Sequence, residues 1–325
     1  MKRLFSYALC AVFLFSTAKS AEAFSPQAIP AKACIVIDDN DAVLYSQNPL
    51  KKLPPASTVK LVTAMVALDR LDPAVIVKVS RAAAAVRSIK PRLLAGDELT
   101  VLDLLHLALM QSINSAAVAL AEATSGSEGK FVELMNQKAK EIGADDTHFV
   151  TASGMPKGRQ YTTARDLTII LKKALTYPLI REIIGKKEWL VKTVAGRELY
   201  LENTDDLLWS RENMVGGKTG FTRNARHCFV GALDTGNGLI FTAVLGARSR
   251  SRLWESAQLL ADLGTSSRMI GSTEEPLIQP QTCSPEDLSS HVDFEINWKQ
   301  FSSLEEPLFT KHYREAPPAC LDVSR

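Results

Sequence analysis

One stretch of the chain, from Thr58 to Leu71, is apolar on nearly every side of the helix that it predicts. A helix without a polar face must be buried all round, so the fold has to pack other elements about it. Pro54 and Pro55 come just before it, and because proline is excluded from a helix interior, the helix should begin near Ser57. Lys60 stands out, because a charged side chain in a buried helix needs a partner or a function.

The rest of the chain predicts strands towards both ends and helices between them. The predicted strands are Ala33–Asp38, Ala42–Tyr45, Trp189–Val194, Arg226–Leu233 and Leu239–Ala247. The further predicted helices cover residues 101–110, 116–123, 130–142, 164–175 and 252–263. This order predicts an α+β fold, in which an antiparallel sheet is closed by distant segments, flanked by helices and joined to a mostly helical subdomain.

The first 23 residues have the pattern of a secretory signal peptide. Lys2 and Arg3 precede an apolar run, and Ala21-Glu22-Ala23 supplies a cleavage site with small residues. The apolar run is shorter than the ~20 residues that a membrane-spanning helix needs, which disfavours an uncleaved anchor. We therefore expect cleavage near Ala23 and an exported, soluble, periplasmic protein.

The composition changes after about Gly264. Residues 265–325 hold 6 of the 15 prolines, and 10 acidic against 5 basic residues. We expect a folded body over 24–264 and a Pro-rich, acidic C-terminal appendage over 265–325. Cys283 and Cys320 lie in this appendage, where an oxidising compartment would allow them to pair, but the sequence leaves a disulfide and two free thiols both open.

The overall charge excludes one class of function. The chain has 38 Lys and Arg against 36 Asp and Glu, a formal net charge of +2. Proteins that bind nucleic acids normally carry a basic excess, so no nucleic-acid partner is expected.

Ser57 and Lys60 form an S-x-x-K motif at the start of the buried helix. Residues i and i+3 share a helix face, which should place the Lys60 amine beside the Ser57 hydroxyl. A buried lysine loses its proton readily and can activate a serine, while free N–H groups at a helix N-terminus can stabilise an oxyanion. Ser127–Lys130 matches the same pattern, but only Lys60 lies in a helix that is apolar all round.

Other catalytic motifs are absent or incomplete. Lys218-Thr219-Gly220 resembles the end of a P-loop, yet Glu212 stands where a P-loop needs its first glycine. Asp234-Thr235-Gly236 matches an aspartic-protease triplet, but it occurs once and in a predicted hairpin turn. The sequence has no G-x-S-x-G elbow and no H-E-x-x-H pair.

A third motif completes an ordered set. Ser112-Ile113-Asn114, in a predicted turn between helices, matches S-x-N, which is weak alone because Ser46-Gln47-Asn48 matches it too. S-x-x-K, S-x-N and K-T-G in this order are typical of penicillin-recognising serine enzymes. The segments Pro54–Met65, Leu93–Leu105, Ser153–Pro156 and Tyr161–Leu167 narrow the match. From about Ala31 to Leu263, the chain resembles low-molecular-weight penicillin-binding proteins, and among them the D-alanyl-D-alanine carboxypeptidases.

The resemblance implies a catalytic domain over 24–264 and a role for each motif residue. Ser57 would attack the carbonyl between the terminal D-alanines of a peptidoglycan stem peptide, Lys60 would take its proton, and Ser112 would relay a proton to the leaving amine. Ser57 and Phe221 would supply the oxyanion hole through their backbone N–H groups. Substrate binding is implied for Asn114, Lys218, Thr219, Gly220, Phe221 and Arg248. β-Lactam antibiotics are implied as covalent inhibitors, with no metal or cofactor.

Three features depart from the family pattern. Ser115 follows the S-x-N asparagine where aspartate is usual, and Ala225-Arg226-His227 replaces Ala-Gly-aromatic beside the K-T-G strand. The second change adds bulk and charge, and bears on substrate preference. The C-terminal segment is shorter than the family's second β domain and ends without an amphipathic helix, so no strong membrane anchor is expected.

Several activities are compatible with these motifs. A D,D-carboxypeptidase is the expected activity, and a D,D-endopeptidase that cleaves crosslinks with the same residues is the alternative. A class A β-lactamase is disfavoured, because its deacylating glutamate is matched only by Glu133-Leu134-Met135-Asn136, early in the chain and on a predicted helix. A non-catalytic wall-binding protein is disfavoured, because all three motifs are intact.

Overall fold

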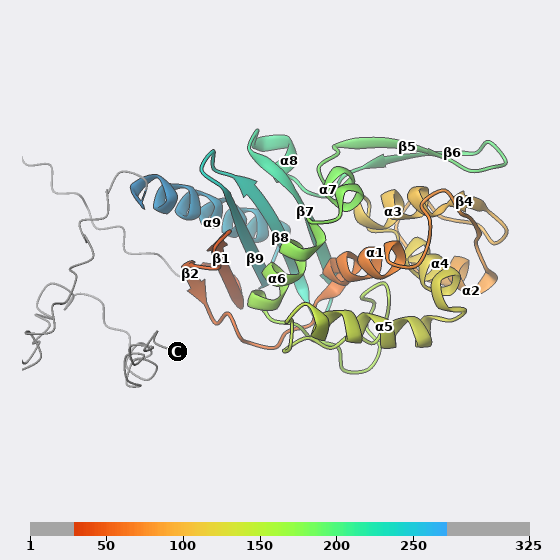
Figure 1. Ribbon diagram of the computed structural model, residues 1–325, viewed down its shortest axis with the longest axis horizontal. Helices are drawn as coiled ribbons and strands as arrows, with labels where there is room; N and C mark the ends of the chain where they lie inside the picture. Colours follow the sequence, from red (N-terminus) through yellow and green to blue (C-terminus); the bar gives the residue numbers. More distant parts are fainter. Residues whose placement is uncertain (1–28, 272–325) are drawn as a thin grey trace, which may run out of the picture. The chain divides into compact units, whose positions relative to one another are not determined.

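The computed structural model describes residues 29–271, which form a five-stranded antiparallel sheet with helices on both faces (Figure 1). The strand order is β2-β1-β9-β8-β7, so β1 pairs with β9 although almost the whole body separates them in sequence. The sheet strands are β1 (Ala33–Asp38), β2 (Val43–Gln47), β7 (Met214–Thr222), β8 (Arg226–Asp234) and β9 (Leu239–Ala247). This arrangement confirms the predicted α+β class and the closure of the sheet by distant segments.

Helices and two small hairpins complete the described chain. The helices are a 3₁₀ turn η1 (Ala56–Val59), α1 (Lys60–Leu68), α2 (Arg81–Ala85), α3 (Val101–Leu109), α4 (Asn114–Ser125), α5 (Glu128–Glu141), α6 (Ala164–Ala174), α7 (Pro178–Ile184), α8 (Leu207–Ser210) and α9 (Arg250–Gly271). The hairpins pair β3 (Ile76–Lys78) with β4 (Glu98–Thr100), and β5 (Glu188–Lys192) with β6 (Glu198–Glu202).

The sheet separates two hydrophobic clusters. Along β1, successive side chains point to opposite faces, so Ile35 and Ile37 join the large cluster that surrounds α1. Cys34 and Val36 join the smaller cluster under α9, which covers the other face in Figure 1. Each face of the sheet is therefore buried by a different part of the chain.

Helix α1 lies at the centre of the large cluster, and every residue from Lys60 to Ala67 is buried. It packs against α3, α4, α5 and α6, which confirms the predicted burial on all sides. The structure differs at both ends of the predicted helix. Ser57 belongs to the 3₁₀ turn η1, so the α-helix proper begins at Lys60, and it ends at Leu68, before the exposed residues Asp69 and Arg70. Tight packing on every side fixes the helix start, and with it the positions of Ser57 and Lys60.

The boundaries of some predicted elements are wrong. Helix α9 begins two residues earlier than expected and continues to Gly271, beyond Gly264 where the composition changes. The predicted strand 189–194 is β5, and its partner β6 was not predicted. Asn114 is the first residue of α4 rather than part of the preceding turn.

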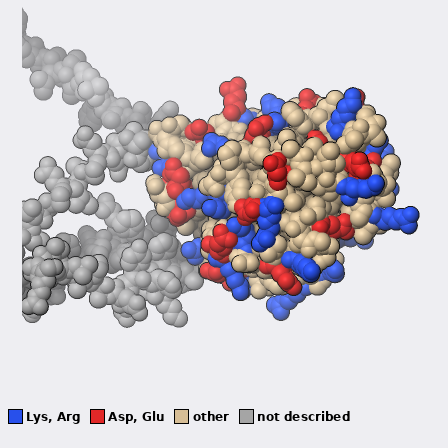
Figure 2. Space-filling model, turned by 45° about the vertical axis from the view of Figure 1, so that its right-hand side comes forward, with Lys and Arg blue, Asp and Glu red and all other residues tan. Residues whose placement is uncertain are grey.

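Some sequence predictions fall outside residues 29–271. They are the signal peptide, most of the C-terminal appendage, and the cysteines Cys283 and Cys320. Within the described range, Cys34 and Cys228 are buried free thiols. None of the helices described here has the length and apolar character needed to cross a membrane. On the face drawn in Figure 2, basic and acidic side chains are interspersed.

Candidate active site

The three motifs meet at one cleft, although each comes from a different part of the fold. Ser57 lies in η1, Ser112 in the turn between α3 and α4, and Thr219 on β7. One part of the cleft has a volume of about 320 Å³. It is lined by Ser57, Ile89, Ser112, Asn114, Met155, Thr204, Thr219, Gly220, Phe221, His227, Arg250, Leu253 and Trp254.

Lys60 lies directly behind Ser57, as the spacing predicted. The distance from Lys60 Nζ to Ser57 Oγ is 2.8 Å. Ser57 is half-buried at the cleft wall, whereas Lys60 is fully buried. The serine hydroxyl therefore faces the cleft while its basic partner is shielded from water.

Two further oxygens surround the Lys60 amine. Asn114 Oδ1 and the Ser153 carbonyl oxygen each lie 2.7 Å from Lys60 Nζ. The Asn114 amide nitrogen donates to the Arg87 carbonyl at 2.7 Å, which fixes the amide so that its oxygen faces the lysine. A neutral amine has two hydrogens for these two acceptors, so its lone pair is left to accept the Ser57 proton.

The electrostatics favour that neutral amine. Burial lowers the pKa of Lys60 well below its ordinary value of 10.5, and the neighbouring charge of Lys218 lowers this pKa further. A low pKa makes the unprotonated base available near neutral pH.

Ser112 is held in an unusual position. Its backbone has a φ of 61°, a left-handed conformation that costs energy for a non-glycine residue. Its hydroxyl oxygen is buried and has no hydrogen-bond partner among the described residues, although Ser112 lines the cleft. Buried polar atoms are normally paired, so this hydroxyl is available to a bound group.

Lys218 lies on β7 and is 1% exposed. Its amine donates to the Thr219 carbonyl at 3.0 Å. Burial lowers the pKa of Lys218 to about 7, against the opposing effect of the carboxylate of Asp205. Asp205 is also fully buried, and burial, with the neighbouring Asp206, raises its pKa to about 7.

β7 is an edge strand of the sheet, and it passes close to the nucleophile at Gly220. A Cβ atom on Gly220 would lie 2.8 Å from the backbone nitrogen of Ser57, so only glycine permits this approach. Phe221 follows, with its side chain 54% exposed beside the cleft. Its ring centroid lies 4.5 Å from that of His227, one of the residues that depart from the family pattern.

Two neighbouring arginines lie differently with respect to the cleft. Arg248 is exposed and is not among the residues that line the cleft, whereas Arg250 lines it. The guanidinium of Arg250 also pairs with Asp206 at 2.6 Å. Both arginines lie in one basic run, so the position of Arg248 as the carboxylate-binding residue stays a prediction.

Two further residues at the site were not predicted. Ser153 contributes its backbone carbonyl to Lys60, and Thr204 brings its hydroxyl oxygen to 2.5 Å from that of Thr219. A carbonyl contact has no side-chain signature, and Thr204 belongs to no recognised motif. Ser153 begins one of the segments that narrowed the family match, but neither contact could have been found without the fold.

The competing matches to the motifs have structural roles. Ser127 caps α5 by accepting a hydrogen bond from the Lys130 backbone at 3.3 Å, so this S-x-x-K pair is a helix cap. Glu133 is exposed on α5, and Asn136 binds the Phe149 backbone through two hydrogen bonds. The part of the cleft lined by Ser57 has no aspartate or glutamate among its described lining residues.

Comparisons with known proteins agree with this geometry. Residues 18–249 match the family described as D-alanyl-D-alanine carboxypeptidase. The chain is 34% identical over 259 residues to the D-alanyl-D-alanine carboxypeptidase DacF of Bacillus subtilis, covering 76% of this chain and 67% of the relative. It is 34% identical over 271 residues to a D-alanyl-D-alanine endopeptidase of Escherichia coli, covering 77% of this chain and 87% of that relative.

A solved structure gives the same result at the level of the fold. A crystal structure of a D-alanyl-D-alanine carboxypeptidase from Mycobacterium tuberculosis aligns with a TM-score of 0.69 and 32% sequence identity. The alignment covers 78% of this chain and 93% of that one. With its ordered motifs gathered around Ser57, this chain belongs to the D-alanyl-D-alanine carboxypeptidase family of penicillin-binding serine peptidases.

Proposed function

We propose that this protein is a serine D,D-carboxypeptidase that removes the terminal D-alanine from peptidoglycan stem peptides through an acyl-enzyme. The observation that carries this proposal is the distance of 2.8 Å between Ser57 Oγ and the buried Lys60 amine. The other two neighbours of that amine are hydrogen-bond acceptors, so its lone pair is directed to the serine.

In the acylation step, Ser57 Oγ forms a bond to the carbonyl carbon between the two D-alanines, and its proton passes to Lys60. The backbone N–H groups of Ser57 and Phe221 would stabilise the resulting oxyanion. The close approach of Gly220 to the Ser57 nitrogen supports this, because it brings the end of β7 to the nucleophile.

The leaving amine needs a proton before the C–N bond breaks. Ser112 is suited to relay it from Lys60, because its unpartnered hydroxyl lines the same cleft. Free D-alanine then leaves, and water attacks the ester to release the shortened peptide and regenerate Ser57.

We assign the terminal carboxylate of the substrate to the end of the cleft that holds Thr219 and Arg250. The Thr219 hydroxyl would donate to that carboxylate. Lys218, which is buried on the same strand, would supply positive potential. We assign to Arg250 the carboxylate contact that the family resemblance implied for Arg248, because it is Arg250 that lines the cleft.

A D,D-endopeptidase remains the second candidate, since a relative with that name covers 77% of the chain at 34% identity. Both reactions would use the same acyl-enzyme and differ only in the leaving amine. Incubation with a pentapeptide monomer and with a crosslinked dimer separates them. We expect free D-alanine from the monomer as the main product, and dimer cleavage without D-alanine release would favour the endopeptidase.

Labelling with a fluorescent penicillin tests the mechanism. We expect the label on Ser57 to persist, because the cleft around Ser57 has no described carboxylate that could activate water as a class A β-lactamase requires. Ser57→Ala should abolish labelling and hydrolysis. Ser127→Ala, which removes the other S-x-x-K serine, should retain both. Rapid turnover of penicillin, or labelling that survives Ser57→Ala, would contradict the mechanism.

We also propose that residues 1–23 direct export to the periplasm and are removed near Ala23. The support is the basic, apolar and small-residue pattern of these residues. N-terminal sequencing of protein from a periplasmic extract made without detergent should begin near Phe24. Recovery only from washed membranes, with residues 1–23 still attached, would contradict this proposal.

A further inference from the structure

The cleft continues beyond Ser57 into a second part with a volume of about 410 Å³. The two parts share Ile89, Asn114, Met155 and Phe221, so they form one continuous channel. The residues that line only the second part are Arg87, Ser88, Pro156, Thr222 and Arg223. Of the residues in the three motifs, only Asn114 lines this second part, so the motifs do not explain the extension.

The direction of β7 indicates what would occupy the second part. This strand has a free edge, along which an extended peptide can lie as an additional strand. If the terminal carboxylate is at Thr219, a peptide that extends along β7 towards Thr222 covers about 10 Å, at ~3.3 Å per residue. The residue before the two D-alanines therefore reaches Thr222 and Arg223.

The second part has apolar walls and cationic ends. Ile89, Met155 and Phe221 offer hydrocarbon and aromatic surface, whereas Arg87 and Arg223 are exposed at the rim. Arg87 is held in place through its backbone, since its carbonyl accepts the hydrogen bond from Asn114 at 2.7 Å.

The surrounding loops add to the positive charge. Residues 87–92 and 223–226 together contain five basic and no acidic residues. No acidic residue within 29–271 forms an ion pair with any of these five. A bound ammonium group would be repelled here, and a carboxylate would be attracted.

We propose that this second part binds the stem-peptide residue that precedes the D-alanine pair, and that Arg87 and Arg223 select a residue with an aliphatic side chain ending in a free carboxylate. This inference rests on the proposed function, because it places the D-alanine pair at Ser57. It adds the substrate class: an acidic stem peptide is preferred over a neutral or basic one.

Three tripeptides X-D-Ala-D-Ala with acetylated N-termini test the proposal, where X is 2-aminoadipate, norleucine or lysine. These side chains have similar lengths and differ in the charge at the end. The kcat/KM for D-alanine release should be about tenfold higher for aminoadipate than for norleucine at low salt, and lowest for lysine. High salt should reduce this preference, since the arginines are exposed.

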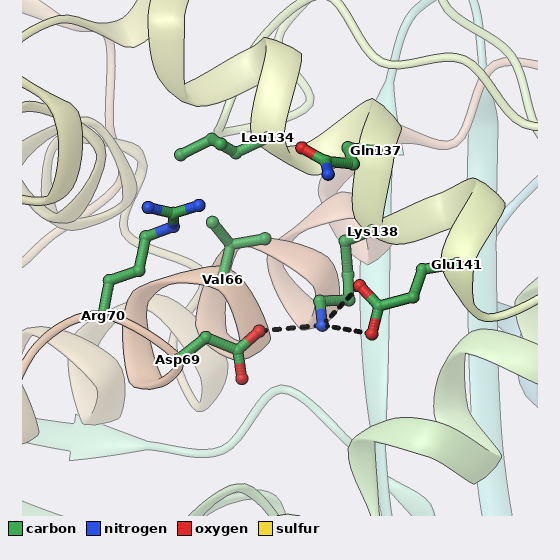
Figure 3. A pocket seen from close by; sticks show the side chains of 7 residues that line it. All are labelled: Val66, Asp69, Arg70, Leu134, Gln137, Lys138 and Glu141. Carbon is green, nitrogen blue, oxygen red and sulfur yellow. Dashed lines mark hydrogen bonds and ion pairs between the residues drawn. The ribbon is translucent and has the colours of Figure 1, made fainter.

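Variants assign the preference to the two arginines. The ratio of kcat/KM between the aminoadipate and norleucine peptides should fall in Arg87→Gln and in Arg223→Gln, and approach one in the double variant. Arg70→Gln is the matched control, because it removes the same charge at the far end of α1, in the hollow drawn in Figure 3. This control should keep the wild-type ratio, and an equal loss in the control would overturn the assignment.

Peptide binding to Ser57→Ala, measured by calorimetry, separates this inference from the proposed function. Turnover of all three peptides without a charge preference would overturn the inference and leave the carboxypeptidase intact. Tighter binding of the aminoadipate peptide without D-alanine release from any peptide would support the inference and contradict the function. Absence of both binding preference and release would overturn both.

Discussion

The hydroxyl oxygens of Thr204 and Thr219 lie 2.5 Å apart. Thr204 follows β6, and its backbone N–H and its hydroxyl contact the Met110 carbonyl at 3.1 and 3.2 Å. Met110 lies two residues before Ser112, so Thr204 connects the K-T-G strand to the S-x-N turn. When the Thr204 hydroxyl donates to Thr219 instead of to Met110, the Thr219 proton is left for the substrate carboxylate, which is the arrangement that our assignment requires.

Replacement of Thr204 by valine should therefore weaken substrate binding. Loss of one hydrogen bond of about 1 kcal/mol corresponds to a rise in KM of about fivefold, with a smaller change in kcat. Steady-state kinetics on a D-Ala-D-Ala peptide would measure both. Thr204→Ser keeps the hydroxyl and should restore KM, whereas an equal defect in both variants would indicate a packing role.

The electrostatic coupling of Lys60 and Lys218 predicts how the rate depends on pH. Burial and the charge of Lys218 both lower the pKa of Lys60, so acylation should fall as the pH drops and Lys60 gains its proton. Since burial lowers the pKa of Lys218 to about 7, Lys218 carries its charge below about pH 7 and disfavours that protonation there.

Removal of the Lys218 charge should then shift the acid limb of the pH–rate profile, which is the pH range in which acylation falls because Lys60 gains a proton. In Lys218→Gln, the pKa of Lys60 should rise, because a neighbouring positive charge is lost, and the acid limb of penicillin acylation should shift to higher pH. Lys218→Arg keeps the charge and should leave the limb closer to its original position. Stopped-flow acylation across the pH range measures the limb, and an unchanged midpoint in Lys218→Gln would exclude the coupling.

Asp205 predicts a pH dependence of stability. Burial raises its pKa in the folded protein from 3.8 to about 7, so the folded state retains a proton that the unfolded chain loses in this window. The stabilising contribution is complete below pH 3.8 and is lost as the pH rises through about 7. Lys218 has its effect above this window, between about 7 and 10.5.

Asp205→Asn should remove much of the fall in the free energy of unfolding between pH 3.8 and about pH 7. Urea unfolding over that pH range would give the free energy of unfolding for each variant. Asp145→Asn, at an exposed position on the surface, is the control and should retain the wild-type slope. If Asp205→Asn also retains it, the buried carboxyl does not titrate as its surroundings indicate.

The sequence predicted the parts of this protein that depend on local pattern. The apolar sequence around Lys60 determined both its helix and its burial, and the spacing of Ser57 and Lys60 placed them in contact. The hairpin of β8 and β9 also followed from two strand-like runs joined by turn residues. In each case, neighbours in the sequence supply the physical cause.

Features that depend on distant contacts were missed. The Ser153 carbonyl reaches Lys60 across 93 positions, and Thr204 meets Thr219 only because β7 packs beside its loop. The choice of Arg250 over Arg248 depends on the exact start of α9, which periodicity locates only within a few residues. The ordered motifs identified residues that meet at the cleft, but not the contacts that orient them.

Gly154 allows the loop after α5 to reach the nucleophile. Its φ is +79°, and a Cβ atom there would lie 1.9 Å from the Ala56 carbonyl oxygen, one residue before Ser57. Ala56 itself has a φ of 50°, so this part of the chain has little room to relax. Gly126 has the same φ of +79°, with nothing within 4 Å of a Cβ.

This pair separates backbone strain from steric displacement of the active site. Gly126→Ala should lower the free energy of unfolding by about 1 kcal/mol, because alanine is strained at this positive φ, and it should leave penicillin acylation unchanged. Gly154→Ala should lower the free energy of unfolding by roughly 1–3 kcal/mol more than Gly126→Ala does, because of the clash with the Ala56 carbonyl. It should also slow acylation at least about tenfold, because Ser57 is displaced. Thermal unfolding and acylation rates measure the two effects. Equal stability and equal rates in both variants would mean that the Ala56 carbonyl moves aside without disturbing Ser57.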